Sequence, residues 1–174
     1  MNTDYINRIK FITLTAVFTA LVFVFTAFVN LRLPIGQGGL IHLGNVPLFI
    51  CAILLGRKSG AIAGGIGMAL FDLVSGWTLW APFTFVIVGT MGYVVGKIAE
   101  NRKSISRYTA ALIAALIIKV AGYYIAEWII YKDAVAPLLS IPGNVIQVGT
   151  AAVMVLFTIN PIEISLRKAG IRYV

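Results

Sequence analysis

The stretch FITLTAVFTALVFVFTAFV, residues 11–29, carries no charged side chain. A helix needs about 20 predominantly apolar residues to cross the hydrocarbon core of a bilayer. Similar apolar runs recur along the chain, and none alternates apolar and polar residues as a β-barrel strand would. Of all 174 residues, 60% are hydrophobic and only 11% are charged, which is too little polar surface to cover a water-soluble globule. The sequence therefore predicts an all-α integral membrane protein surrounded by a lipid bilayer.

Charged residues and turn residues divide the chain into about six predicted spans, at 9–30, 41–56, 59–75, 81–99, 107–131 and 142–162. The second and third spans are short, and the segment GRKSG, residues 56–60, predicts a tight turn between them. Six spans with short connections use nearly the whole chain, so we expect residues 1–174 to form a single transmembrane domain. The first apolar run exceeds the core of about 7–15 residues typical of a signal peptide, so we expect a retained helix.

The distribution of basic residues predicts the orientation of these spans. All of the 14 lysines and arginines except Arg32, Lys119 and Lys132 fall on one side if successive spans alternate in direction. Cytoplasmic loops carry an excess of lysine and arginine. We therefore expect both termini in the cytoplasm, with the chain in the cell membrane.

Several functional classes lack the residues they need. The net charge of +8 is spread between apolar runs instead of along one solvated face, so it does not indicate nucleic-acid binding. One histidine and one cysteine predict neither a metal site nor a catalytic set, and no cofactor is expected in this chain. Gly96 and Lys97 lack the rest of a phosphate-binding loop, so any ATP would be used by partner subunits.

The fifth predicted span carries ionisable groups inside the membrane. Lys119, Tyr123 and Glu127 are spaced four residues apart, so they share one face of a helix. Such groups are costly in a bilayer and favour the wall of a polar cavity. The alternative is that Lys119 snorkels, or pairs with a carboxylate such as Asp72 or Glu127, only for packing.

Further candidate ligand-binding residues lie toward the predicted outer side. Asn144 and Gln147 are three residues apart on the last span. Their amides either bind a ligand or form hydrogen bonds between helices, and the sequence favours neither interpretation. Asp72 ends the third span, and Trp77 and Trp80 follow it. These tryptophans are either membrane-interface residues or a wall on which a flat heteroaromatic ligand would stack.

The first outer loop supplies three more polar candidates, Gln37, His42 and Asn45. The glycine-rich segment GQGG, residues 36–39, is either a mobile lid or a plain connection. Because polar groups from four segments fall on the outer side, a pocket facing outward is expected instead of a continuous channel.

Small residues recur at helical spacing in several spans. Glycine rows at 60, 64 and 67 and at 89, 92 and 96 favour close packing between helices within the chain. Ala16 and Ala20 form a similar face on the first span.

The order of several motifs resembles the substrate-binding S component of energy-coupling-factor vitamin transporters. The motifs are the alanine face of the first span, HLGNVP at 42–47, LGRKSGA at 55–61, DLVSG at 72–76, APFT at 81–84 and GYVVGK at 92–97. The resemblance implies a capture subunit that delivers a water-soluble vitamin or precursor to a coupling transmembrane subunit and two cytoplasmic ATPase subunits. It also implies that Ala16 and Ala20 dock on the coupling subunit, and that the membrane is the plasma membrane of a prokaryotic cell.

The sequence is compatible with two kinds of ligand, an uncharged heteroaromatic ring and a carboxylate. The aromatic and amide candidates suit hydroxymethylpyrimidine or pyridoxine, whereas an unpaired Lys119 would favour the carboxylate of pantothenate. Two other classes compete with a transporter subunit. A small membrane enzyme is disfavoured because the sequence shows no recognisable pair of nucleophile and base. An assembly protein would use its small-residue faces only to bind partners.

Overall fold

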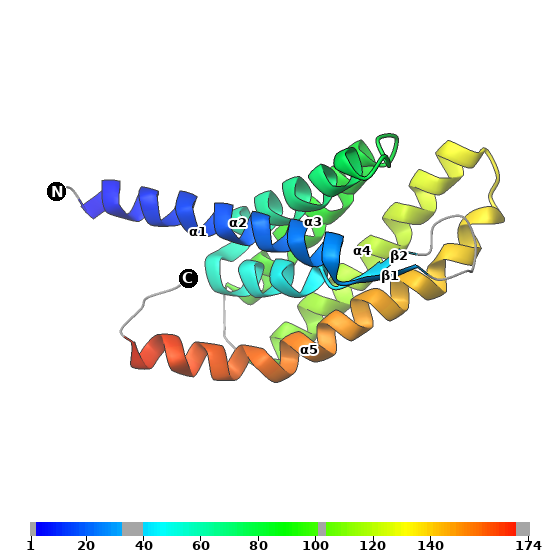
Figure 1. Cartoon of the computed structure of the whole chain (residues 1–174). Helices are drawn as coiled ribbons and strands as arrows, with labels where there is room; N and C mark the ends of the chain where they lie inside the picture. Colours follow the sequence, from blue (N-terminus) through cyan, green and yellow to red (C-terminus); the bar gives the residue numbers. More distant parts are fainter. Residues whose placement is uncertain (1–2, 33–39, 101–103, 170–174) are drawn as a thin grey trace.

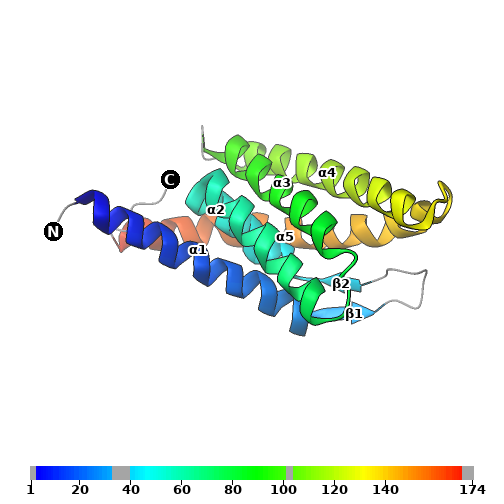
Figure 2. The same cartoon turned by 90° about the horizontal axis from the view of Figure 1, so that it is seen from above.

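The structure, a computed structural model, describes residues 3–32, 40–100 and 104–169. It contains five long helices, packed side by side (Figures 1 and 2). Their bounds are α1 Thr3–Phe28, α2 Asn45–Val74, α3 Ala81–Ala99, α4 Ile105–Tyr131 and α5 Ile141–Lys168, with a short 3₁₀ helix, η1 Ala136–Ser140, before α5. All five contain a segment long and apolar enough to cross a membrane. The predicted helical class is therefore confirmed.

A small antiparallel β pair joins α1 to α2, which the sequence did not predict. Strand β1, Asn30–Arg32, pairs with β2, Leu40–His42, and Asn30 lies opposite His42. The amide of Leu43 then donates to the carbonyl of Val29, at 3.0 Å. Because these backbone bonds keep the chain extended, α2 begins only at Asn45, and the predicted start of the second span at residue 41 was wrong.

Helix α2 folds back on itself at Gly56. This residue has φ 83° and ψ 179°, a conformation that side-chain-bearing residues rarely adopt. In a straight helix, Ala52 and Gly60 would lie about 12 Å apart along the axis. Instead, a Cβ built on Gly60 would come within 2.7 Å of the Cβ of Ala52. The two arms of α2 therefore pack against each other, and the turn falls where GRKSG predicted one.

The structure thus has five helices, of which α2 is folded. Its first arm and second arm correspond to the second and third predicted spans. The beginning of α1 and the end of α5 lie at the same end of the bundle (Figure 1), which we call the terminal end. The number of membrane crossings and the location of both termini in the cytoplasm stay predictions.

The glycine rows pack inside the chain, where α2 crosses α3. A Cβ on Gly92 would collide with the backbone of Gly60, and a Cβ on Gly96 would collide with the backbone of Arg57. Gly67 lies against α1, where a Cβ would come within 2.8 Å of the carbonyl oxygen of Thr19. The backbones approach so closely because these positions have no side chain. The arms of α2 are thereby fixed against both α1 and α3.

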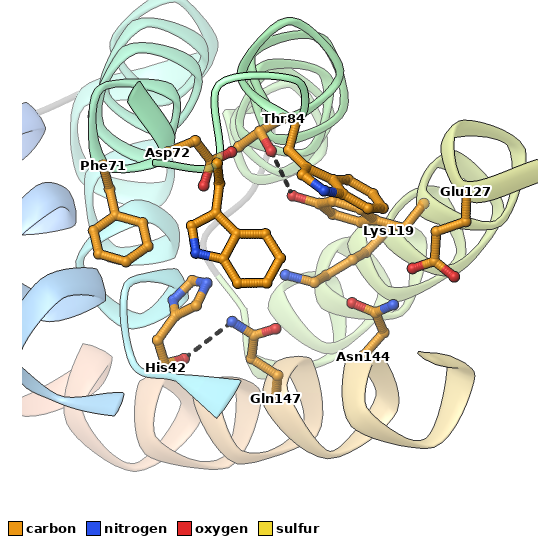
Figure 3. Close-up of a pocket in the computed structure, with 11 residues that line it drawn as sticks. His42, Phe71, Asp72, Thr84, Lys119, Glu127, Asn144 and Gln147 are labelled. Carbon is orange, nitrogen blue, oxygen red and sulfur yellow. Dashed lines mark hydrogen bonds between the residues drawn. The ribbon is translucent and has the colours of Figure 1, made fainter. Parts of the chain in front are cut away.

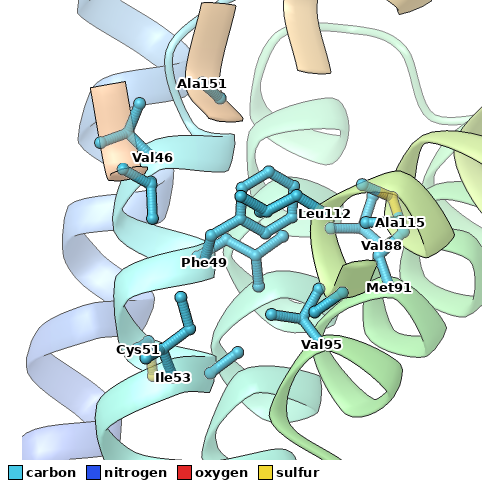
Figure 4. Close-up of a cluster of buried hydrophobic side chains, with 14 of the residues drawn as sticks. Val46, Phe49, Cys51, Ile53, Val88, Met91, Val95, Leu112, Ala115 and Ala151 are labelled. Atoms are coloured by element: carbon cyan, nitrogen blue, oxygen red, sulfur yellow. The ribbon is translucent and has the colours of Figure 1, made fainter. Parts of the chain in front are cut away.

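The apolar core lies between the first arm of α2 and helices α3, α4 and α5 (Figure 4). Phe49 and Cys51 point inward from α2 and are fully buried. Val88 and Met91 of α3 and Ala115 of α4 lie on the side toward which Phe49 points. This core holds the helices in the positions from which polar side chains enter a cavity beyond it.

Candidate functional site

A cavity of about 90 Å³ lies at the end of the bundle opposite the terminal end, which we call the cavity end. Its walls come from β2, the end of α2 and the turn after it, the start of α3, the second half of α4 and the start of α5 (Figure 3). The lining residues are His42, Phe71, Asp72, Trp77, Trp80, Thr84, Lys119, Tyr123, Glu127, Asn144 and Gln147. Nine of the eleven predicted ligand-binding residues thus meet in one place.

His42 is held in the cavity wall by hydrogen bonds on both sides. Its Nδ1 accepts from the backbone amide of Gly44 at 3.2 Å, and its carbonyl oxygen accepts from Nε2 of Gln147 at 3.2 Å. Burial, with a smaller effect of the nearby Lys119 charge, holds the pKa of His42 well below its usual value. The ring is therefore neutral at physiological pH, and its remaining proton is on Nε2.

Lys119 enters the cavity from the middle of α4 and is only 2% exposed. Its Nζ lies 5.2 Å from the centroid of the Tyr123 ring, close enough for a cation–π contact. In the parts of the chain that the structure describes, neither Asp72 nor Glu127 forms an ion pair with Lys119. The structure therefore does not show the packing pair considered as the alternative for this residue.

Aromatic side chains form one wall of the cavity. The rings of Trp80 and Tyr123 are 6.4 Å apart between centroids and tilted by 35°. Trp80 also meets Tyr131 edge-on at 6.1 Å, and Trp77 is a further aromatic residue of the cavity lining. Such a wall offers flat apolar area to a ring-shaped ligand.

Asp72 and Thr84 occupy the side of the cavity between α2 and α3. The hydroxyl of Thr84 lies 3.1 Å from the hydroxyl of Tyr123 and also within reach of the Asp72 carboxyl group. The other carboxyl oxygen of Asp72, Oδ2, is buried and has no hydrogen-bond partner among the described residues. A buried acceptor without a donor is costly, so this oxygen favours a donor from a ligand.

Amide and carboxyl groups complete the side formed by α4 and α5. The side chains of Asn144 and Gln147 point toward the end of Lys119 (Figure 3). Glu127 lies farther along α4, where its carboxyl group is within hydrogen-bonding reach of Ser140. Together, these groups can accept and donate hydrogen bonds around one small polar ligand.

Two lining residues were missed by the sequence analysis, Phe71 and Thr84. Thr84 lies four residues after Trp80, so the same spacing argument that joined Lys119 to Tyr123 could have placed it on the Trp80 face. Phe71 precedes Asp72 and contacts Phe23 of α1 with ring centroids 6.5 Å apart, and no sequence signal distinguishes it from core aromatics.

Two predicted residues do not join the cavity wall. Gln37 lies outside the described residues. Asn45 is fully buried at the start of α2 and is not among the lining residues. Neither polar atom of its amide has a hydrogen-bond partner in the described part of the chain.

The alanine face of α1 lines a separate, apolar groove between α1 and the second arm of α2. Ala16 and Ala20 form its floor with Thr15 and Thr19, and Ile62 and Ile66 border it from α2. The groove therefore offers a partner helix a smooth surface on which backbones can approach closely.

The described residues contain no group of three or more histidine, cysteine, aspartate or glutamate side chains that could hold a metal ion. The polar groups of the cavity are arranged around a space, and they do not converge on one point.

Comparison with known proteins identifies relatives over most of the chain. A family model described as the S component of ECF-type riboflavin transporters matches residues 6–163. The thiamine precursor transporter HmpT of Lactococcus lactis subsp. cremoris is 31% identical over 145 residues, which cover 82% of this chain and 81% of that protein. An uncharacterised protein of Pyrococcus woesei is 34% identical over 106 residues, which cover 61% of this chain and 70% of that protein.

Proposed function

We propose a ligand and a role for this chain, which belongs to the family of ECF-type riboflavin transporter S components. The chain is a substrate-binding subunit of an importer for a vitamin precursor, and it captures a single-ring ligand of the hydroxymethylpyrimidine or pyridoxine type. The observation that carries this proposal is the cavity, in which aromatic walls surround polar groups from five segments of the chain.

The size of the cavity favours one small ring over a flavin. An engineered cavity of about 150 Å³ binds one benzene molecule. The cavity here measures about 90 Å³, which is smaller still, so even one substituted ring requires it to widen and a larger ligand requires a greater change. Riboflavin has three fused rings and a ribityl chain, which exceed this space. The related thiamine precursor transporter supports the same choice.

Pantothenate is the second candidate, and one observation favours it. Lys119 is buried and has no carboxylate partner among the described residues, so it could receive the carboxylate of pantothenate. Pantothenate has no ring to stack on the aromatic side chains of the cavity, and this is why we place it second.

Delivery requires partners. The family implies an ECF module, and we propose that it comprises a coupling transmembrane subunit and two cytoplasmic ATPase subunits, which hydrolyse ATP on behalf of this chain. The groove around Ala16 and Ala20 is the proposed contact with the coupling subunit. In this arrangement the cavity end faces outward from the cell membrane, and the terminal end with most of the basic residues lies in the cytoplasm.

Titration of the purified full chain with hydroxymethylpyrimidine, pyridoxine, pantothenate and riboflavin tests the ligand. Calorimetry should give the tightest binding for one of the two single-ring ligands. Tightest binding of pantothenate would select the second candidate, and binding of none of the four would favour an assembly protein without a solute.

The docking surface is tested by copurification of the chain with the coupling subunits. Ala16→Trp should abolish copurification and leave ligand affinity unchanged, because it fills the groove far from the cavity. Leu14→Trp is the matched control, since Leu14 is an exposed α1 residue outside the groove. Equal behaviour of the two variants would refute the assignment of the groove.

A further inference from the structure

The cavity contains two complementary polar groups with open valences toward a ligand. One is Oδ2 of Asp72, a buried acceptor without a donor in the described part of the chain. The other is the ammonium group of Lys119, whose side chain is buried in the cavity wall and has no ion-pair partner among the described residues. Each group costs free energy in the empty protein, and a ligand that satisfies it recovers that free energy.

The two groups lie on different walls of the cavity. Asp72 lies near the end of α2 and beside Thr84, whereas Lys119 extends from α4 toward the amides of Asn144 and Gln147 (Figure 3). No ion pair joins their side chains. A single ligand placed between them would meet an acceptor on one side and a donor on the other.

We infer that Asp72 and Lys119 determine which ligand binds, because one accepts a hydrogen bond from it and the other donates one. An amino group of the ligand donates to Asp72, and a hydroxyl oxygen of the ligand accepts from Lys119. This inference rests on the proposed function. The ligand class is then a single aromatic ring that carries an amino group on one side and a hydroxyl-bearing group on another, as hydroxymethylpyrimidine does.

Other polar groups of the cavity are less suited to these two roles. The backbone carbonyl of His42 already accepts from Gln147, and its Nδ1 already accepts from Gly44. The carboxyl group of Glu127 lies near Ser140, whose hydroxyl donates to the carbonyl oxygen of Pro137 at 2.9 Å. Asp72 is therefore the cavity carboxyl group with a buried oxygen that lacks a donor in the described part of the chain, and Lys119 is the cationic donor that lines the same cavity.

The test measures three ligands against matched variants of the full chain. The ligands are 4-amino-5-hydroxymethyl-2-methylpyrimidine, the same ring without the amino group, and the same ring with methyl in place of hydroxymethyl. The wild-type chain should bind the first at least about tenfold more tightly than either truncated ring, because each truncation leaves a buried group unpaired. This comparison needs no mutation, so a folding defect cannot obscure it.

Two variants assign each preference to its residue. Asp72→Leu removes the acceptor and should abolish the preference for the amino group while retaining the preference for the hydroxyl. Lys119→Met should do the reverse. Asp72→Asn keeps one acceptor oxygen and should restore part of the amino preference. Asp133→Leu and Lys132→Met make the same changes at exposed positions of the cavity end and should retain both preferences.

The outcomes separate this inference from the function on which it rests. If the wild type binds none of the three ligands, the proposed function fails and the inference fails with it. If the wild type binds the complete ligand but Asp72→Leu and Lys119→Met keep both preferences, or weaken all three ligands equally, only the inference is overturned.

Discussion

The two ends of the bundle differ in whether their buried charged side chains have partners within the chain. At the terminal end, the carboxylate of Glu163 accepts from the hydroxyl of Tyr108 at 2.7 Å and lies 3.8 Å from the guanidinium of Arg167. At the cavity end, Asp72 keeps an unpaired oxygen and Lys119 has no ion pair among the described residues.

Glu100, which lies at the same end of the bundle as Glu163, also has a structural role. Its Oε1 accepts from the backbone amide of Arg57 at 2.9 Å, in the first turn after the fold of α2 at Gly56. An amide there has no partner within its own helix, so the carboxylate caps the second arm. The comparison teaches that the acids of the terminal end join parts of the fold, whereas Asp72 and Lys119 at the cavity end have no such partners among the described residues, in keeping with the ligand-binding role that we propose for them.

The largest effect that sharpens this comparison is expected at Lys119. Lys119→Met should weaken binding of hydroxymethylpyrimidine roughly 100-fold, because a charged donor to the ligand is lost. The melting temperature of the free chain should stay equal or rise, since a buried cation without an ion pair is replaced by an apolar side chain of similar length. A large fall in melting temperature would show that Lys119 stabilises the fold.

Tyr108→Phe should show the opposite pattern at the terminal end. Removing the hydroxyl leaves a carboxylate oxygen of Glu163 without this donor, so the free energy of unfolding should fall by about 1–3 kcal/mol. Ligand affinity should not change, because the cavity lies at the other end of the bundle. Denaturant unfolding and calorimetric titration of the same preparation check both statements, and reduced affinity would break the separation of the two ends.

The pH dependence of stability should reveal His42. Its pKa is lowered in the folded chain, so the unfolded chain binds more protons just below the usual value of 6.5. Stability is therefore fully present above pH 6.5 and falls as the pH drops below it, by at most about 1.4 kcal/mol per pH unit.

His42→Asn isolates this contribution, because its side-chain oxygen can still accept from the amide of Gly44. The difference in stability between wild type and variant should change with pH only below about 6.5. A difference that is constant from pH 8 to pH 5 would contradict a neutral, buried histidine.

The smallest effect is expected at Glu100. Glu100→Gln keeps an oxygen for the amide of Arg57 but removes the charge from a partly exposed ion pair of 3.7 Å. The free energy of unfolding should fall by about 0.5 kcal/mol, and by less at high salt. Unfolding curves at two ionic strengths measure the change, and a loss independent of salt would indicate that the hydrogen bond, and not the charge, is responsible.

Much of the fold was accessible from local patterns. The apolar runs predicted the helices, and the glycines around Arg57 predicted the turn that folds α2. The start of α2 was misplaced because the pairing of β1 with β2 depends on residues that are distant in sequence. No periodicity in the apolar segment revealed that Ile41 lies in a strand.

For the candidate site, the sequence predicted which residues share one helix face, but not which residues of other helices point into the cavity. Lys119, Tyr123 and Glu127 share a cavity because helical spacing places them on one face. Asn45 has the same kind of polar side chain as Asn144, but it lies at the start of α2 and outside the cavity wall. The direction of a side chain from a neighbouring helix depends on how that helix is rotated, and one sequence does not give that rotation.

By itself, the sequence determined that this chain needs lipid, that it is helical, and which polar residues share a helix face, because hydrophobicity and helical spacing act within single segments. Only the tertiary structure decided that Asp72 and Lys119 face one cavity without pairing. It also decided that Thr84 joins them and Asn45 does not. The physical reason is that close contacts such as Gly60 against Gly92 fix the position and rotation of whole helices, and those contacts join residues far apart in the chain.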